Sequence, residues 1–281
     1  MRMSLSRRLS FFGALLLALG LAACVQVPVE GSRSGSISQD RAFASRGDIP
    51  TASDDSDARR RARIRLELAA TYYGKGQFTT ALDEVKQAES IDPRLPATHE
   101  MRALIYDALG DAPRAEAAYQ RALDLDPGNG SVMHNYGWFL CNRGRLAEAD
   151  AQFDRALRFP LTVDSSRTML ARGVCQMRAG LFTEAEKTLL GSYELNTGNP
   201  ATAYNLAWVL LRRGEAERAR FYIRRVNNVP EQVTAESLWL AARIEHRLGN
   251  ASGRDEIGAQ LRTRFPGANE TNAFEMGRFD E

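Results

Sequence analysis

A pattern of small and turn-forming residues recurs every 34 residues along most of the chain, and this period constrains the fold more than any other feature. One tyrosine, one glycine, two alanines and one proline return together at this spacing, which is hard to obtain by chance. The first two copies are Tyr72, Gly76, Ala81, Ala88 and Pro93, and then Tyr106, Gly110, Ala115, Ala122 and Pro127.

Further copies follow, with one slip of two residues after the third. The third copy contains Gly137, Gly144, Ala149, Phe153 and Ala156, and the fourth contains Gly173, Gly180 and Ala185. The fifth contains Ala207, Gly214 and Ala219, and a degenerate last copy contains Ala242, Gly249, Leu261 and Pro266. This pattern resembles the tetratricopeptide repeat, whose unit is two antiparallel helices joined by a short turn. The units would span 62–95, 96–129, 130–163, 166–199, 200–233 and 235–268.

The resemblance implies an all-α fold, a right-handed superhelical solenoid of about six tetratricopeptide repeats over 58–268. Small residues at the eighth position of each unit would let its two helices approach closely. Glycines such as Gly76 supply the backbone that ends a helix, and Pro93 and Pro127 stop the second helix. Arg254 replaces the expected alanine in unit six, which fits a terminal unit that shows a polar face to water.

Composition agrees with a folded helical protein and argues against a nucleic-acid partner. Hydrophobic residues make up 44% of the chain and charged residues 26%, as in soluble globular proteins. Residues 1–23 hold three of the 37 basic residues and none of the 35 acidic ones. The remainder is therefore nearly neutral, without the strongly basic surface that nucleic-acid binding requires.

The first 23 residues predict a lipoprotein signal peptide. Three arginines precede the apolar run 11–22, which is too short to span a membrane. The run ends in Leu21-Ala22-Ala23-Cys24, which resembles the bacterial lipobox and makes Cys24 the acylated first residue of the mature protein. The alternative is an ordinary secretory signal. Val25 is not the Asp that retains enteric lipoproteins in the inner membrane, so we expect the outer membrane, with the protein facing the periplasm.

Two segments lie outside the predicted repeats. After Cys24, the segment up to residue 57 is rich in Ser, Gly, Asp and Pro and predicts a flexible tether (24–57). Residues 269–281 are interpreted as a C-terminal tail.

Two similar segments are candidate partner-binding sites. Residues 134–138 and 204–208 occupy equivalent positions of units three and five, and within each the Asn and the Trp share a helix face. In the repeat family these positions face the groove, where asparagine can clamp a peptide backbone and tryptophan can anchor a partner. The alternative is that the tryptophans pack between units. The candidates are His134, Asn135, Trp138, Tyr204, Asn205 and Trp208.

Unit one offers a second candidate surface. Leu66, Ala70 and Tyr73 occupy the comparable stripe and could form an apolar groove. Alternatively, the tether folds over them in place of a preceding unit.

Cys141 and Cys175 lie on the first helices of adjacent units. In an oxidising periplasm, two thiols that meet form a disulfide, which requires Cα atoms within about 7 Å. Two separate buried thiols are the alternative.

The sequence predicts no enzyme, no cofactor, no metal site and no small-molecule substrate. His99, His134 and His246 fall in three different units and belong to no nucleophile motif. Two cysteines and scattered histidines do not give zinc-ligand spacing.

A closer resemblance rests on segments 135–141, 144–149 and 153–157, together with 203–210, 238–245 and 261–266. With the lipobox and six units, these resemble the type IV pilus biogenesis/stability lipoproteins, the PilF/PilW pilotin family. The resemblance implies a protein anchored in the inner leaflet of the outer membrane, whose partner is the secretin subunit of the pilus and which supports secretin localisation and multimerisation. The alternative function is an outer-membrane repeat lipoprotein that regulates peptidoglycan synthesis or other envelope assembly.

Overall fold

The computed structural model describes residues 57–162 and 164–280. The predicted signal peptide, Cys24 and almost all of the predicted tether lie outside this range. The described residues form thirteen α-helices and one short 3₁₀ helix and contain no strand. The helices are α1 (Asp57–Gly74), α2 (Phe78–Ile91), α3 (Pro96–Ala108), α4 (Ala112–Leu125), α5 (Gly130–Asn142), α6 (Leu146–Leu157), α7 (Ser165–Arg178), α8 (Phe182–Leu195), α9 (Pro200–Arg212), α10 (Ala216–Asn227), η1 (Pro230–Gln232), α11 (Ala235–Arg247), α12 (Ala251–Arg264) and α13 (Asn269–Glu275).

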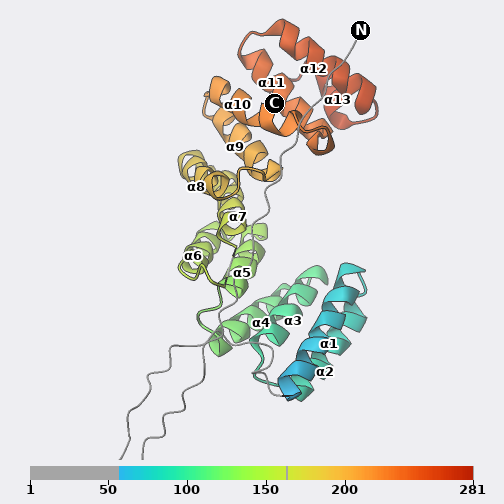
Figure 1. Ribbon diagram of the computed structural model, residues 1–281, viewed down its shortest axis with the longest axis vertical. Helices are drawn as coiled ribbons and strands as arrows, with labels where there is room; N and C mark the ends of the chain where they lie inside the picture. The colour runs from blue at the N-terminus through green and yellow to red at the C-terminus, as the bar shows by residue number, and fades with distance from the viewer. Residues whose placement is uncertain (1–56, 163, 281) are drawn as a thin grey trace, which may run out of the picture. The chain divides into compact units, whose positions relative to one another are not determined.

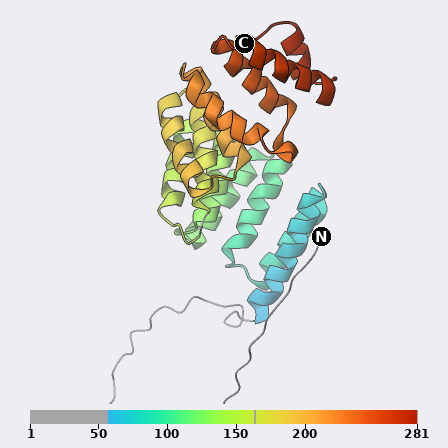
Figure 2. The same ribbon diagram turned by 45° about the horizontal axis from the view of Figure 1, so that its top comes forward.

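Helices α1 to α12 form six pairs, one pair for each predicted repeat, which confirms the all-α repeat fold (Figure 1). Within a pair the connecting turn is only a few residues long, so the two helices run antiparallel. Each second helix also packs on the first helix of the next pair. A second view shows successive pairs lying against one another (Figure 2).

The turn inside each pair depends on a glycine with a left-handed backbone. Gly76, Gly110 and Gly144 have φ of +71°, +78° and +74°, and the last three units repeat the feature. The Gly76 N–H donates to the Tyr73 carbonyl at 2.9 Å, and the next N–H donates to the Tyr72 carbonyl. These bonds satisfy carbonyls that the helix end leaves free.

Small residues bring the two helices of each pair together, as the repeat pattern predicts. The eighth residue of every unit is buried. A Cβ added at Gly173 would lie 2.6 Å from Cγ of Leu189, and one added at Gly137 would lie 3.0 Å from the ring of Phe153. Large side chains of the second helix therefore rest directly on the backbone of the first.

Aromatic packing joins the second and third pairs. The ring of Tyr119, on α4, is stacked on that of Tyr136 with centroids 5.3 Å apart and lies 5.4 Å from that of Phe139. All three side chains are buried. Because pairs of helices alone cannot bury their apolar faces, these side chains join the second and third pairs in one core cluster.

The segment 269–281, interpreted from the sequence as a C-terminal tail, contains the short helix α13. α13 packs on α11 and α12, and a Cβ at Gly258 would overlap the Phe274 ring, so the aromatic ring fills the space left by the glycine. The expectation that Arg254 faces water is wrong in part. Its guanidinium lies 5.6 Å from the ring centroid of Phe279, so the segment after α13 covers it. None of the described helices is both long and apolar enough to cross a bilayer.

Candidate partner-binding groove

The first helices of neighbouring units lie against one another, in the pairs α1–α3, α5–α7, α7–α9 and α9–α11. Their free faces form a common surface, and a pocket of about 310 Å³ opens on it across α5, α7 and α9. We call this the central pocket. Its lining residues are His134, Asn135, Trp138, Arg167, Leu170, Ala171, Val174, Ala201 and Asn205.

The central pocket brings together four of the six residues that the sequence singled out in units three and five. Trp138 is partly buried against the core, and the guanidinium of Arg178 lies 5.1 Å from its ring centroid. The tryptophan therefore both packs against the core and lines the pocket, and its contact with a partner stays a prediction.

The two asparagines already use their amide groups inside the protein. Asn135 donates through Nδ2 to the carboxylate of Glu100 at 2.7 Å, and Ser131 donates to the same carboxylate at 3.2 Å. Burial raises the pKa of Glu100, and these two hydrogen bonds oppose that shift. Asn205 donates to the Ala201 carbonyl at 2.8 Å. These hydrogen bonds orient the two side chains, and each amide still offers its oxygen and its second N–H to a partner.

His134 is a buried, structural member of the pocket wall. Its Nδ1 lies 2.9 Å from Thr168 Oγ1, which joins α5 to α7. Burial lowers the pKa of its imidazole to about 4, so the ring is neutral at neutral pH. A neutral buried imidazole suits packing and hydrogen bonding.

The other two residues from unit five lie outside the central pocket. Tyr204 lines an adjacent pocket of about 350 Å³ with Asn205, Gln232 and Glu236. Trp208 is partly buried, with its ring centroid 5.9 Å from that of Phe182. The surface therefore continues beyond the central pocket toward unit six.

The structure places the three unit-one candidates in two different surroundings. Leu66 and Ala70 line a pocket of about 480 Å³ together with Pro96 and Ala97. Tyr73 lies apart from it and packs on Phe78, with ring centroids 5.6 Å apart. Burial raises the pKa of the Tyr73 hydroxyl, and nearby Asp107 raises it further.

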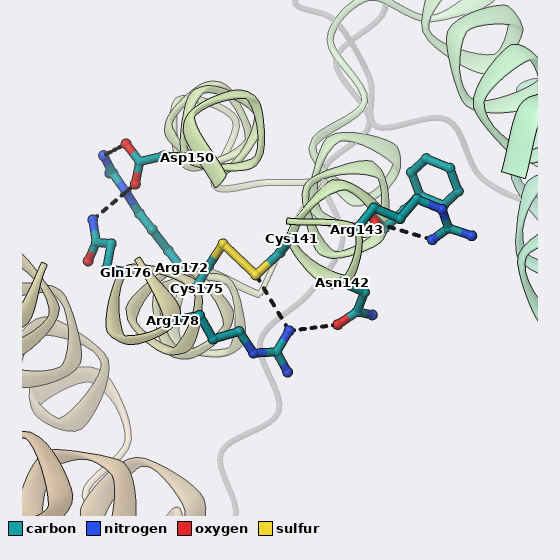
Figure 3. The surroundings of a disulfide bond; sticks show 9 residues. Cys141, Asn142, Arg143, Asp150, Arg172, Cys175, Gln176 and Arg178 are labelled. Atoms are coloured by element: carbon teal, nitrogen blue, oxygen red, sulfur yellow. Dashed lines mark hydrogen bonds and ion pairs between the residues drawn. A yellow bond between two sulfur atoms is a disulfide. The ribbon is translucent and has the colours of Figure 1, made fainter. Parts of the chain in front are cut away.

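A disulfide joins Cys141 on α5 to Cys175 on α7, with Cα atoms 5.8 Å apart. Figure 3 shows Arg178 beside the bond, donating to Asn142 Oδ1 at 2.8 Å and to Cys141 Sγ at 3.7 Å. On the other side, Arg172 binds Asp150 through two hydrogen bonds of 2.8 and 2.9 Å. The disulfide links two helices that line the central pocket and so fixes their spacing.

Sequence reasoning missed the charge on this surface. Arg178, Arg212 and Arg247 stand at the thirteenth position of units four, five and six, and Arg243 stands where units three and five have tryptophan. Comparing each repeat position across units would have found them. Within the described residues no group of three or more His, Cys, Asp or Glu side chains could hold a metal ion.

Comparison with known proteins identifies the same repeat and also finds relatives that match most of the chain. The tetratricopeptide repeat family matches residues 96–129 and 118–151. The chain is 27% identical over 210 residues to the type IV pilus assembly protein PilF of Pseudomonas aeruginosa, covering 75% of this chain and 83% of that protein. The solved structure of P. aeruginosa PilF matches with a TM-score of 0.68 and 26% identity, over 78% of this chain and 99% of that one.

The solved structure of PilW, a widely conserved type IV pilus biogenesis factor, matches with a TM-score of 0.69 and 30% identity. The match covers 75% of this chain and 97% of PilW. The chain belongs to the PilF/PilW family of type IV pilus biogenesis proteins. Because the match spans almost all of PilW and three quarters of this chain, the shared fold extends well beyond a few generic repeats. Membership of this family supports a protein-binding role in pilus assembly.

Proposed function

We propose that this protein is a lipid-anchored pilotin that binds the secretin subunit of the type IV pilus and promotes its assembly at the outer membrane. The observation that carries the proposal is the match to PilW and PilF over nearly their whole length. The sequence Leu21-Ala22-Ala23-Cys24 supports the lipid anchor and Val25 the outer membrane.

The lining of the central pocket supports a role for this protein in binding a segment of its partner. An indole, an imidazole and short aliphatic side chains surround a space of about 310 Å³, which suits an apolar or aromatic side chain of an extended peptide. Partly buried tryptophans are frequent centres of binding energy in protein interfaces. The disulfide and the His134–Thr168 contact hold the walls in place, so binding costs little ordering of the pocket.

The anchor would act by raising local concentration. Acyl chains on Cys24 would confine the protein to the membrane where the secretin assembles, which increases the encounter rate of captured subunits without any additional contact. The separate contributions of anchor and pocket can be tested because they lie in different parts of the chain.

The test is a deletion strain complemented with the wild-type gene, with Cys24→Ser or with Trp138→Ala. We expect deletion to abolish heat-stable secretin multimers on gels and twitching motility, and the wild-type gene to restore both. Cys24→Ser should leave secretin monomers away from the outer membrane. A deletion strain with normal secretin multimers and a cell-wall defect would refute the pilotin function and favour a role in peptidoglycan synthesis.

A further inference from the structure

The last two repeat units carry a basic surface that the pilotin function does not explain. Arg212 lies on α9, and Arg243 and Arg247 lie on α11. They line one cavity of about 250 Å³ together with Leu211, and its remaining wall includes Phe279 and Asp280 from the segment after α13. Two adjacent first helices thus present three guanidinium groups to a single cavity.

These charges are not neutralised within the repeat units. Among the described residues, neither Arg212 nor Arg243 forms an ion pair with a carboxylate. The guanidinium of Arg212 instead lies 5.5 Å from the Trp208 ring centroid. Burial lowers the pKa of the Arg243 guanidinium, and the charges of Arg212 and Arg247 lower it further. The three charges therefore repel one another and would be stabilised by an anion.

Other arginines of unit five behave differently. Arg213 and Arg218 pair with the buried carboxylate of Glu186, at the end of α9 and on α10. Arg220 and Arg224 on α10 both face the buried carboxylate of Glu245. Because the arginines around buried carboxylates are compensated, the uncompensated cluster is a local feature of the α9–α11 surface. Such segregated charge steers a partner of opposite sign.

The chain's own segment 277–280 shows which chemistry fits this surface. The Phe279 ring is stacked on His246 with centroids 4.6 Å apart and lies 5.3 Å from the Trp239 centroid. Its carbonyl accepts a hydrogen bond of 3.1 Å from Nε of Arg243. The neighbouring Asp280 carboxylate lies 3.6 Å from Arg247. The segment that occupies this surface thus places an aromatic ring against α11 and, at the next residue, a carboxylate near the arginines.

We propose that this α9–α11 surface binds a partner-protein segment in which an aromatic residue is followed by carboxylates, and that Phe279 and Asp280 are an internal stand-in for that segment. The carboxylate end of this stand-in is held weakly, whereas Phe279 is packed on α11. The side chains of Arg247 and Asp280 are 57% and 78% exposed, and ion pairs this exposed hold a segment weakly. Cavity space remains beside the segment, so a longer partner segment can place a second carboxylate near Arg212.

The test measures peptide binding to the purified full-length protein by fluorescence anisotropy. The probe is fluorescein-labelled Gly-Ser-Phe-Asp-Glu, and the control probe is Gly-Ser-Phe-Lys-Lys. We expect the Phe279→Ala/Asp280→Asn double variant to bind the acidic probe at least tenfold more tightly than the wild type. Asp280→Asn alone, which retains the aromatic packing, should give a smaller gain and guards against misfolding of the double variant.

Two further substitutions in the double variant locate the site. Arg243→Gln should weaken binding of the acidic probe at least tenfold. Arg158→Gln, which replaces an exposed arginine directly after α6, should leave the affinity for this probe unchanged. The proposal would be overturned if the acidic probe bound the wild type and the double variant equally, or bound neither. It would also be overturned if the lysine probe bound as well as the acidic probe, or if inorganic phosphate displaced the acidic probe completely. The assay contains no secretin, so its failure is distinguishable from failure of the pilotin function.

Discussion

Cys141 and Cys175 lie at a sequence separation of 34, one repeat length, and their disulfide ties α5 to α7. In a Cys24→Ser variant purified without reductant and then denatured, we expect neither remaining cysteine to react with a maleimide. Because the bond closes a loop of about 34 residues, removing it with Cys141→Ser/Cys175→Ser should lower the free energy of unfolding by about 3–4 kcal/mol. Two reactive thiols in the denatured, unreduced protein would contradict the pairing.

At Gly173 a large side chain of the second helix of unit four rests on the backbone of the first. An added methyl group would lie 2.6 and 2.7 Å from Cγ and Cδ2 of Leu189, which is fully buried. We expect Gly173→Ala to lower the free energy of unfolding by about 1–3 kcal/mol, as overpacking does, measured by urea denaturation.

The matched control for that substitution is Gly74→Ala, at the end of α1, where an added Cβ would meet nothing within 4 Å. This variant should be neutral or more stable by up to about 1 kcal/mol, because alanine favours the helix. If both substitutions had the same effect, close approach at Gly173 would not be the cause.

His134 makes the stability sensitive to acid. Its pKa is about 4 in the folded protein because of burial, against 6.5 ordinarily. Above pH 6.5 the ring is neutral in both states and contributes no pH dependence. As the pH falls from 6.5 toward 4, the unfolded chain takes up a proton that the folded protein does not, so stability falls.

The predicted size of this loss is about 2–3 kcal/mol by pH 4.5. His134→Gln removes the titrating group, so its free energy of unfolding should fall less between pH 7.5 and pH 4.5 than that of the wild type, by about this amount. Parallel pH profiles for the two proteins would show that the imidazole is protonated in the folded state.

Much of the fold could be predicted because the repeat encodes it locally. The glycine of each turn and the small residue at the eighth position act within one unit, so their spacing alone indicates the helix pairs. The helix within the C-terminal segment 269–281 was not predicted, for the opposite reason. α13 packs Phe274 on Gly258, and this contact depends on a partner outside the helix's own short, weakly patterned sequence.

The candidate site could be predicted only in part. Asn135 and Trp138 were found because residues three apart share a helix face. The use of Asn135 on Glu100, and the position of Tyr73 away from the Leu66 pocket, depend on contacts between units that periodicity does not encode. The cavity lined by Arg212 and Arg243 was missed because arginines on a helix surface are ordinarily solvated. What distinguishes these two arginines is that neither pairs with a carboxylate among the described residues, which the sequence does not show.

The most direct test of the central claim is the affinity of purified secretin subunit for wild-type protein, Trp138→Ala and Phe221→Ala. Trp138 lines the central pocket, whereas Phe221 is an aromatic residue of similar class, 55% exposed on the second helix α10. We predict that Trp138→Ala weakens binding at least tenfold, an effect of about 1.4 kcal/mol or more, and that Phe221→Ala binds as the wild type does. Wild-type affinity in Trp138→Ala, with loss in Phe221→Ala, would contradict binding through the surface of the first helices.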